Sequence, residues 1–327
     1  MGILNKTRKV KSEMSLEEVT HLLNKLRLPI SYVFTPTNLE KERKKFFNSD
    51  LYEPQFKYEI VNNMNNDVFI QLGGIEKITG ADPRIIDFYM ELIEAKNLTN
   101  KLMNSVGDNE KVTHYSKKKY GKPSDILFRN ACRGLRTKGK GYNIQSANRD
   151  EIYLGFDEMK QIFEEAFKLV GLDDWVFAKS KKIQRNGVKL LLKRKGVFVD
   201  PNIKKKSSGI KNTIVHEIGT HALRAVSGME SGVHALAKPN LDSYLPVEEG
   251  LALYNEEINN LLFWKDFQKR LLYVWAINVG ESLSFRELFN VISAFMMKKS
   301  AFNFVLRVKR GMGDTSLPGI YTKDYFY

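Results

Sequence analysis

The residues most able to do chemistry lie in one short motif that contains two histidines and a glutamate. Residues 213–221 read Thr-Ile-Val-His-Glu-Ile-Gly-Thr-His, so Glu217 directly follows His216 and precedes His221. Two imidazoles on one helix can bind Zn²⁺, and a carboxylate beside the first can deprotonate a metal-bound water. Residues 246–252, Pro-Val-Glu-Glu-Gly-Leu-Ala, add carboxylates for a third ligand. These two segments together indicate a zinc hydrolase site divided between two helices.

The five-residue spacing of the two histidines differs from the commoner metalloprotease motif, in which they are four residues apart. On an ideal α-helix, residues five apart point about 140° away from each other, which is too wide for one ion. A turn widened to the i→i+5 pattern of a π-helix would bring His216 and His221 to one face, and Gly219 within the interval is compatible with that distortion. We therefore predict a locally widened helix, and an unbroken i→i+4 ladder from 214 to 224 would contradict it.

We expect the third ligand to come from the downstream helix. Glu249 begins a segment whose apolar residues follow a helical register and can pack against the first helix; they are Leu251, Leu253 and Ile258. His234, between the two segments, is the alternative ligand. A pair of buried structural histidines is the simpler interpretation, but it leaves the carboxylate of the second helix unexplained.

Composition limits the class of protein. The chain has 327 residues and 43% apolar content, which suits one large domain or two smaller ones with a buried core. No apolar run is long enough for a membrane span, and the first residues lack the apolar stretch of a secretory signal. The single cysteine, Cys132, excludes an internal disulfide framework and fits a reducing compartment. We therefore predict a cytoplasmic protein.

The chain is strongly basic. It has 52 Lys and Arg residues against 38 Asp and Glu residues, which gives a net charge of +14. Such a charge attracts acidic protein tails over a long range. The lysine clusters at 117–119 and 204–206 lack an aromatic platform or a nucleic-acid-binding module, so we interpret them as solvated loops and helix faces. The expected partner is an acidic peptide or protein C-terminal tail, and neither nucleic acid nor a membrane.

Helix-start signals recur along the chain. Three capping boxes and one Asp-Pro pair predict helices from Ser15 to about Leu26, from Thr37 to about Asn48, from Asp82 to about Met103 and from Ser284 onward. Amphipathic patterns predict a further helix over 157–170 and successive helices over 247–307. Residues 105–150 are polar and contain several glycines, so we predict loops there, with His114 as a surface residue.

Residues 174–200 change to extended runs. Asn186-Gly187 is typical of a tight hairpin turn between two strands. Val197–Val199 is the candidate edge strand that would hold an extended peptide beside the metal helix. An ordinary core strand is an equally supported interpretation of the same residues.

The motif segments resemble a known family. His-Glu-Ile-Gly-Thr-His-Ala-Leu-Arg at 216–224 and Glu-Glu-Gly-Leu-Ala at 248–252 are similar to the QEGLA-motif proteins, long catalogued as a domain of unknown function. The animal members of that family are the microtubule-associated tyrosine carboxypeptidases. Shorter similar segments extend the resemblance from about residue 30 to the end of the chain; they lie at 32–38, 54–58, 120–123 and 310–324.

The resemblance implies a zinc metallopeptidase with His216, His221 and Glu249 as metal ligands and Glu217 as the general base. Glu248 stands where many members have Gln, so it is the less favoured ligand. The implied reaction is Glu217-assisted attack of a zinc-bound water on a C-terminal peptide bond, with Tyr or another aromatic residue as the candidate released group. Tyrosine removal from tubulin is known for animal members. The motif does not identify the substrate of the other members.

A carboxypeptidase also needs a cation that recognises the terminal carboxylate of its substrate. Arg224, on nearly the same helix face as the second histidine, is one candidate, and it serves equally well as a brace for a nearby acid. Arg310 and Lys323 in the similar C-terminal segment are the others. Tyr321 and Tyr327 are candidate donors to an oxyanion, although aromatic residues near a terminus commonly only pack against it.

The expected architecture is α+β, a mostly helical zincin-like metallopeptidase with a small antiparallel sheet beside the metal-binding helix. We place this catalytic domain at residues 31–327, after a basic N-terminal extension with a helix at residues 1–30. Two other functions remain open beside the metallocarboxypeptidase. One is a zinc aminopeptidase or endopeptidase with the same ligands, and the other is a non-enzymatic basic binding protein with a structural metal.

Overall fold

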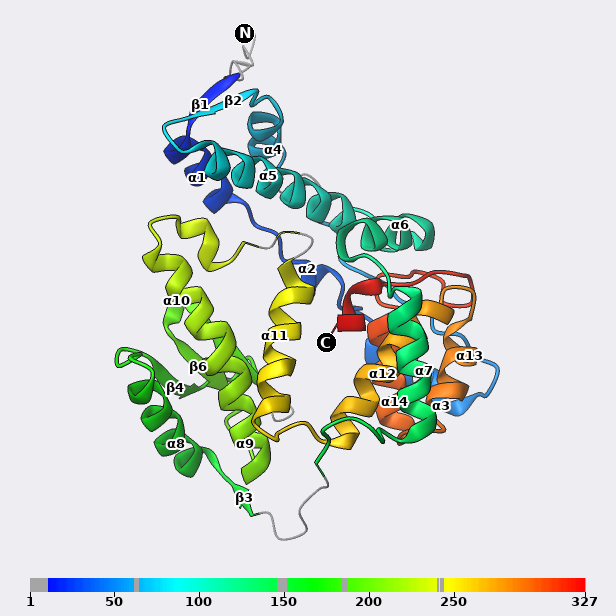
Figure 1. Ribbon diagram of the computed structural model, residues 1–327. Helices are drawn as coiled ribbons and strands as arrows, with labels where there is room; N and C mark the ends of the chain where they lie inside the picture. The colour runs from blue at the N-terminus through cyan, green and yellow to red at the C-terminus, as the bar shows by residue number, and fades with distance from the viewer. Residues whose placement is uncertain are drawn as a thin grey trace. The chain divides into compact units, whose positions relative to one another are not determined.

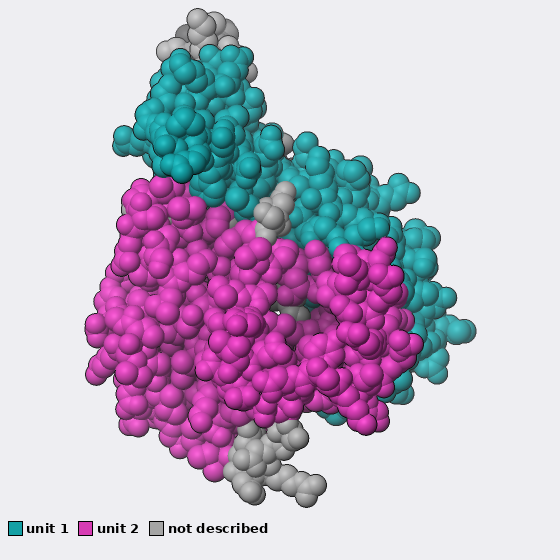
Figure 2. All heavy atoms as spheres, viewed as in Figure 1, with its two compact units in different colours: residues 1–123, 240–242, 276–324 teal, residues 124–239, 243–275, 325–327 magenta. Residues whose placement is uncertain are grey.

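The computed structural model describes residues 11–61, 65–145, 152–183, 187–239, 241 and 244–326. The chain forms two compact units (Figure 2). Unit 1 comprises residues 1–123, 240–242 and 276–324, and unit 2 comprises residues 124–239, 243–275 and 325–327. Within the described residues, no helix is both long enough and apolar enough to cross a membrane.

Unit 1 is largely helical, with one two-stranded parallel sheet. Its helices are α1 (Leu16–Lys25), α2 (Ile30–Val33), α3 (Leu39–Asn48), α4 (Asn66–Gly73), α5 (Pro83–Met103), α6 (Asn109–Tyr120), α13 (Phe285–Ile292) and α14 (Lys298–Val308). The strands are β1 (Glu13–Ser15) and β2 (Lys77–Thr79), and the short 3-10 helix η4 (Thr322–Phe326) begins in this unit. Phe46 of α3 makes edge-on ring contacts with Phe285, Phe289 and Phe302, which joins segments far apart in the sequence.

Unit 2 combines helices with short strands (Figure 1). Its helices are α7 (Asp125–Thr137), α8 (Phe156–Leu169), α9 (Ser207–Thr213), the π-helix η2 (Ile214–Ala222), α10 (Leu223–Glu230), α11 (Tyr244–Ile258) and most of α12 (Trp264–Val279). Short 3-10 helices lie at η1 (Leu192–Arg194) and η3 (His234–Ala237). The strands are β3 (Tyr153–Leu154), β4 (Val176–Lys179), β5 (Val188–Leu191), β6 (Gly196–Val199) and β7 (Lys205–Lys206).

The three-stranded sheet of unit 2 corrects two predictions. Its order is β4-β6-β5, with β4 parallel and β5 antiparallel to β6, so the sheet is mixed rather than antiparallel. The two runs flanking Asn186-Gly187 are therefore not hairpin partners, because β6 lies between them; Asn186 itself is outside the described residues. The tight connection instead joins β5 to β6 through η1 and Lys195, which has a left-handed backbone with φ of 43°.

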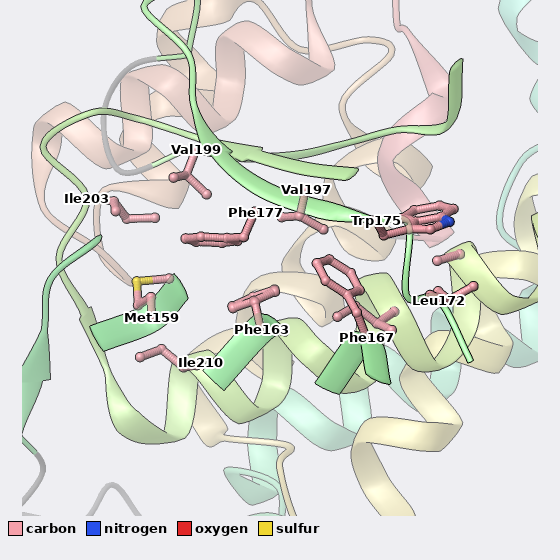
Figure 3. Close-up of a cluster of buried hydrophobic side chains, with 12 residues drawn as sticks. Met159, Phe163, Phe167, Leu172, Trp175, Phe177, Val197, Val199, Ile203 and Ile210 are labelled. Atoms are coloured by element: carbon pink, nitrogen blue, oxygen red, sulfur yellow. The ribbon is translucent and has the colours of Figure 1, made fainter. Parts of the chain in front are cut away.

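Val197–Val199 is a core strand and not an edge. β6 is hydrogen-bonded on both sides, and all four of its residues are buried. One face of this sheet packs on aromatic side chains of α8, where the rings of Phe163 and Phe177 stack with centroids 4.3 Å apart (Figure 3). The same apolar cluster includes Ile218 and Ala222 of the π-helix η2. The sheet thus supports the histidine-bearing helix from its buried side.

Most helix predictions are confirmed. The helices beginning after Ser15 and Ser284 have complete capping boxes, and α5 begins after Asp82, whose side chain accepts from the Arg84 amide. Helix α8 and the run of helices from α11 to α14 also agree with the apolar patterns. The mostly helical α+β class is therefore confirmed.

Two local predictions are wrong. Helix α3 ends at Asn48 as expected, but the Thr37 hydroxyl donates to the Lys57 carbonyl and does not cap the helix. Residues 105–150 are not mainly loops, because α6 and α7 occupy most of the range. Each of these helices begins after a capping side chain, Asp108 for α6 and Ser124 for α7, and His114 is an exposed residue on α6.

A buried lysine joins three segments of unit 1. Lys309 directly follows α14 and is fully buried. Its ammonium group donates to the carbonyl oxygens of Gly280, Leu283 and Gly319. A lysine has three N–H donors, so each one has a carbonyl partner.

Replacement of Lys309 by Met should destabilise the chain strongly, because it leaves three buried carbonyl groups without their donor. We expect the free energy of unfolding to fall by about 3 kcal/mol, measured by urea denaturation. Lys299→Met, at an exposed position of α14, is the matched control and should change it by less than about 0.5 kcal/mol. Equal stability of the two variants would show that the ammonium does not hold these segments together.

Candidate metal centre

The two histidines share one face of a helix because the helix is widened between them. The π-helix η2 continues α9 and leads into α10, which confirms the predicted distortion. The imidazole ring centroids of His216 and His221 are 4.8 Å apart. The Thr220 hydroxyl donates to the carbonyl of Val215, five residues earlier, at 3.2 Å, and so satisfies a carbonyl within the widened turn.

Helix α11 packs beside η2 and supplies the third candidate ligand (Figure 1). The Asn255 amide donates to the Thr220 hydroxyl at 2.9 Å and fixes one point of this contact. Glu249 of α11 faces both imidazoles, with its carboxylate oxygens 3.7 Å from His216 Nε2 and 4.0 Å from His221 Nε2. One potential ligand atom from each of the three residues lies within 4.8 Å of the others.

Two further glutamates of α11 orient the imidazoles. His216 Nδ1 lies 2.7 Å from a Glu256 oxygen, and His221 Nδ1 lies 2.8 Å from a Glu248 oxygen. A neutral imidazole that donates from Nδ1 presents the lone pair of Nε2. In that tautomer the two Nε2 atoms, which lie toward Glu249, present the lone pairs that a metal requires, and the carboxylates of Glu256 and Glu248 accept the Nδ1 hydrogens.

Each orienting carboxylate also has a guanidinium partner. Arg224 Nε lies 2.7 Å from Glu248, and its two terminal nitrogens donate to the Leu236 and Ala237 carbonyls of η3. Gly228 permits this approach, since a Cβ there would lie 2.6 Å from backbone atoms of those two residues. On the other side, a terminal nitrogen of Arg270 lies 3.4 Å from Glu256.

The electrostatics differ among the acidic groups. Burial raises the pKa of Glu249, and the adjacent imidazoles oppose that shift only in part. Burial also acts to raise the pKa of Glu248, but hydrogen bonds from His221 and Arg224 outweigh it and the pKa is lowered. The pKa of Glu256 is lowered by the corresponding bond from His216 and the charge of Arg270, again against burial. Glu248 and Glu256 are thus held as anions.

The His221 imidazole has a raised pKa. Burial disfavours its charged form, but the Glu248 hydrogen bond and the charges of Glu249 and Glu217 outweigh burial. Glu217 is half-buried and lies close enough to influence both His221 and Glu249. Its carboxylate therefore lies near His221 and Glu249, but it does not belong to the group of three candidate ligands.

The donor set fits a catalytic zinc ion. Two imidazoles and one carboxylate are a ligand combination of zinc hydrolases, which leave a fourth position for water or substrate. Bonds of about 2.0–2.1 Å at tetrahedral angles place ligand atoms about 3.3 Å apart, close to the separations of Glu249 from the two Nε2 atoms. His216, His221 and Glu249 could thus hold such an ion with small side-chain adjustments.

The other residues singled out in the sequence have different surroundings. All three guanidinium nitrogens of Arg224 have protein partners, which favours the brace interpretation. Arg310 lies in unit 1 and is paired with Asp324, and Tyr321 is buried in the same unit. Lys323 is half-buried in η4. Two of the candidate residues fall outside what the structure describes, the side chain of His234 and the whole of Tyr327.

Sequence reasoning missed two groups at the site. Glu256 follows Glu249 by seven residues, which is two helical turns, so the spacing could have placed both on one face. Lys205 belongs to the lysine cluster that the sequence predicts to be solvated, but this residue is half-buried and its ammonium donates to the Thr213 hydroxyl at 2.8 Å. No local spacing rule connects a lysine on β7 with the helix that follows, so only the folded structure reveals this contact.

Two imidazoles, a third candidate ligand and a separate carboxylate are the kinds of group from which a hydrolytic metal centre can be built. Residues 44–327 match the microtubule-associated tyrosine carboxypeptidase family, and the chain belongs to that family. Mouse microtubule-associated tyrosine carboxypeptidase 1 is 26% identical over 300 residues, which are 89% of this chain and 53% of the relative. Mouse putative tyrosine carboxypeptidase MATCAP2 is 26% identical over 309 residues, 92% of this chain and 50% of the relative. The chain thus spans about half the length of these curated relatives.

Glu256→Gln should weaken metal binding without removing a candidate ligand. The amide oxygen can still accept the Nδ1 hydrogen of His216, but without the negative charge it holds the imidazole less firmly and makes it a weaker metal ligand. We expect Zn²⁺ affinity, measured by competition with a chromogenic chelator, to fall about 10- to 100-fold. Glu257→Gln removes a neighbouring acid of the same helix as the control, and a similar loss in both variants would refute the orienting role of Glu256.

Proposed function

We propose that the chain is a zinc-dependent metallocarboxypeptidase of the zincin-like class. The observation that carries this proposal is the convergence of His216, His221 and Glu249 with the separate carboxylate of Glu217 beside them. The supporting sheet behind the histidine-bearing helix is consistent with that class. The names of the relatives, which are tyrosine carboxypeptidases, support the carboxypeptidase reaction.

In the proposed mechanism, bound Zn²⁺ supplies Lewis acidity, which polarises a peptide carbonyl and lowers the pKa of water toward about 7. Glu217 accepts the proton of the attacking water on a carboxylate oxygen and later delivers it to the nitrogen of the leaving amino acid. Glu248 and Glu256 keep the Nδ1 hydrogens of His221 and His216 in place, so that both Nε2 atoms stay directed at the ligand position. Arg224 and Arg270 hold those two carboxylates.

The proposed substrate is a protein C-terminal tail that ends in Tyr or another aromatic residue. The names of the relatives identify them as tyrosine carboxypeptidases associated with microtubules. A net charge of +14 favours an acidic tail, because it increases the rate at which such a tail reaches the protein. We propose the cytoplasm as the place of action, in keeping with the names of the relatives and the single cysteine.

Glu217→Gln tests the assignment of the general base. The amide cannot accept the proton of water, whereas the three candidate ligands are unchanged, so zinc content should stay at the wild-type level while turnover falls at least about 100-fold. Zinc is measured by mass spectrometry and turnover by release of amino acid. Substantial residual hydrolysis would remove Glu217 from this role, and loss of zinc would place it among the ligands.

The reaction itself is tested with a peptide library that carries free or amidated C-termini. The zinc-loaded chain should release single C-terminal residues only from free acids, since a carboxypeptidase recognises the terminal carboxylate. A chelator should abolish the release, and added zinc should restore it. Internal or N-terminal cleavage would instead indicate an endopeptidase or aminopeptidase, and absence of metal-dependent cleavage would favour a binding protein.

A further inference from the structure

The cationic side chains of unit 2 near the candidate metal site differ in how many of their N–H groups already have partners within the protein. Arg224 gives its three guanidinium nitrogens to Glu248 and to two carbonyls of η3, and Arg270 is paired with Glu256. Lys205 is different. Within the part of the chain that the structure describes, its ammonium has one hydrogen-bond partner, the Thr213 hydroxyl, and no carboxylate within 4.0 Å.

Lys205 lies close to the proposed general base. β7 leads directly into α9, and the Lys205 ammonium reaches forward to Thr213, at the end of that helix. The Thr213 hydroxyl donates its own hydrogen to the Gly209 carbonyl at 2.7 Å, so its oxygen is free to accept from the lysine. Glu217 follows Thr213 by four residues, just after α9 passes into the π-helix η2, and its charge interacts with that of Lys205.

The surroundings leave the charge of Lys205 without a direct counterion among the described residues. Burial lowers the pKa of its ammonium group, and the charges of Glu217 and Asp266 act in the opposite direction. Two of the three ammonium hydrogens have no acceptor within the described part of the chain. A half-buried ammonium with unused donors is a binding group for an anion, because solvation is reduced and the attraction is correspondingly stronger.

We infer that Lys205 binds the α-carboxylate of the C-terminal residue of the peptide substrate. This inference rests on the proposed carboxypeptidase function and names the group that would give it its specificity. Neither the metal-binding motif nor the carboxylate-binding candidates from the sequence include this residue.

The size of one amino acid agrees with this assignment. In a peptide, the terminal carboxyl carbon is separated from the preceding carbonyl carbon by one nitrogen and one Cα, so they are no more than about 3.8 Å apart. A scissile carbonyl beside Glu217 therefore keeps the terminal carboxylate close to Glu217, in the region where the charge of Lys205 acts. Two free N–H donors match two carboxylate oxygens.

The test compares binding of two peptides that differ only at the C-terminus. Fluorescent peptides ending in Tyr, one as the free acid and one as the amide, are titrated into the zinc-loaded Glu217→Gln variant, and Kd is measured by anisotropy. The parent should prefer the acid. Adding Lys205→Gln, which keeps an N–H donor for Thr213 but removes the charge, should reduce the acid-to-amide preference about 10- to 100-fold.

Lys206→Gln is the matched control. It removes the same charge from the next residue of β7, whose side chain points to the other side of the strand and lies over the Tyr153 ring. This variant should retain the preference for the free acid. Thermal unfolding and zinc content are measured for every variant. Lys205→Arg keeps the positive charge and should retain most of the preference for the free acid, so it tests the inference even if Lys205→Gln folds poorly.

The outcomes separate this inference from the function on which it rests. If the wild-type chain releases C-terminal residues and Lys205→Gln keeps the full acid-to-amide preference, the carboxylate is bound elsewhere and the inference is overturned while the function stands. If the wild-type chain cleaves no peptide and its Glu217→Gln variant does not distinguish acid from amide, both fail. Loss of the preference in Lys205→Gln alone supports the assignment.

Discussion

The widened turn between His216 and His221 is the constraint on which the site depends. In an ordinary α-helix, a five-residue interval would direct the two imidazoles about 140° apart, and no third ligand could then complete a common site. The π-helix η2 brings the ring centroids to 4.8 Å. Widening changes the hydrogen-bond partners of the local carbonyls, and the Thr220 hydroxyl satisfies one of them. Thr220 is in turn bound by Asn255 of α11, so the same contact stabilises the distortion and positions the second helix.

Helix α11 then performs two tasks with three glutamates. Glu249 faces the Nε2 atoms, whereas Glu248 and Glu256 bind the Nδ1 atoms of the two imidazoles. Adjacent residues on a helix point about 100° apart, so Glu248 and Glu249 can approach the His221 ring from different sides. Residues seven apart return to nearly the same face, which allows Glu249 and Glu256 to serve one imidazole. Two helices thus suffice for both the candidate ligands and the groups that orient them.

Predictions succeeded where the physical cause is local in the sequence. The capping boxes at Ser15 and Ser284 act within three residues, and the widened turn follows from the histidine spacing once one ion is assumed. Strand order could not be derived in this way, since the placement of β6 between β4 and β5 is decided by its burial on the aromatic face of α8. The sequence predicts loops over α6 and α7 despite the Asp108 and Ser124 caps, because α6 is polar and rich in lysine and α7 contains a glycine.

The charge balance of the site explains why its parts depend on one another. Four carboxylates, Glu217, Glu248, Glu249 and Glu256, share this region with the cations Arg224, Arg270 and Lys205. Counting neutral imidazoles, the group carries one net negative charge, and a divalent metal would change it to one net positive charge. Burial is the main cause of the raised pKa of Glu249, and the negative charges of Glu217 and Glu248 act in the same direction. A site that becomes positive on metal binding favours an anionic ligand, and a peptide with a free terminal carboxylate brings that charge to the position where its last bond would be cleaved.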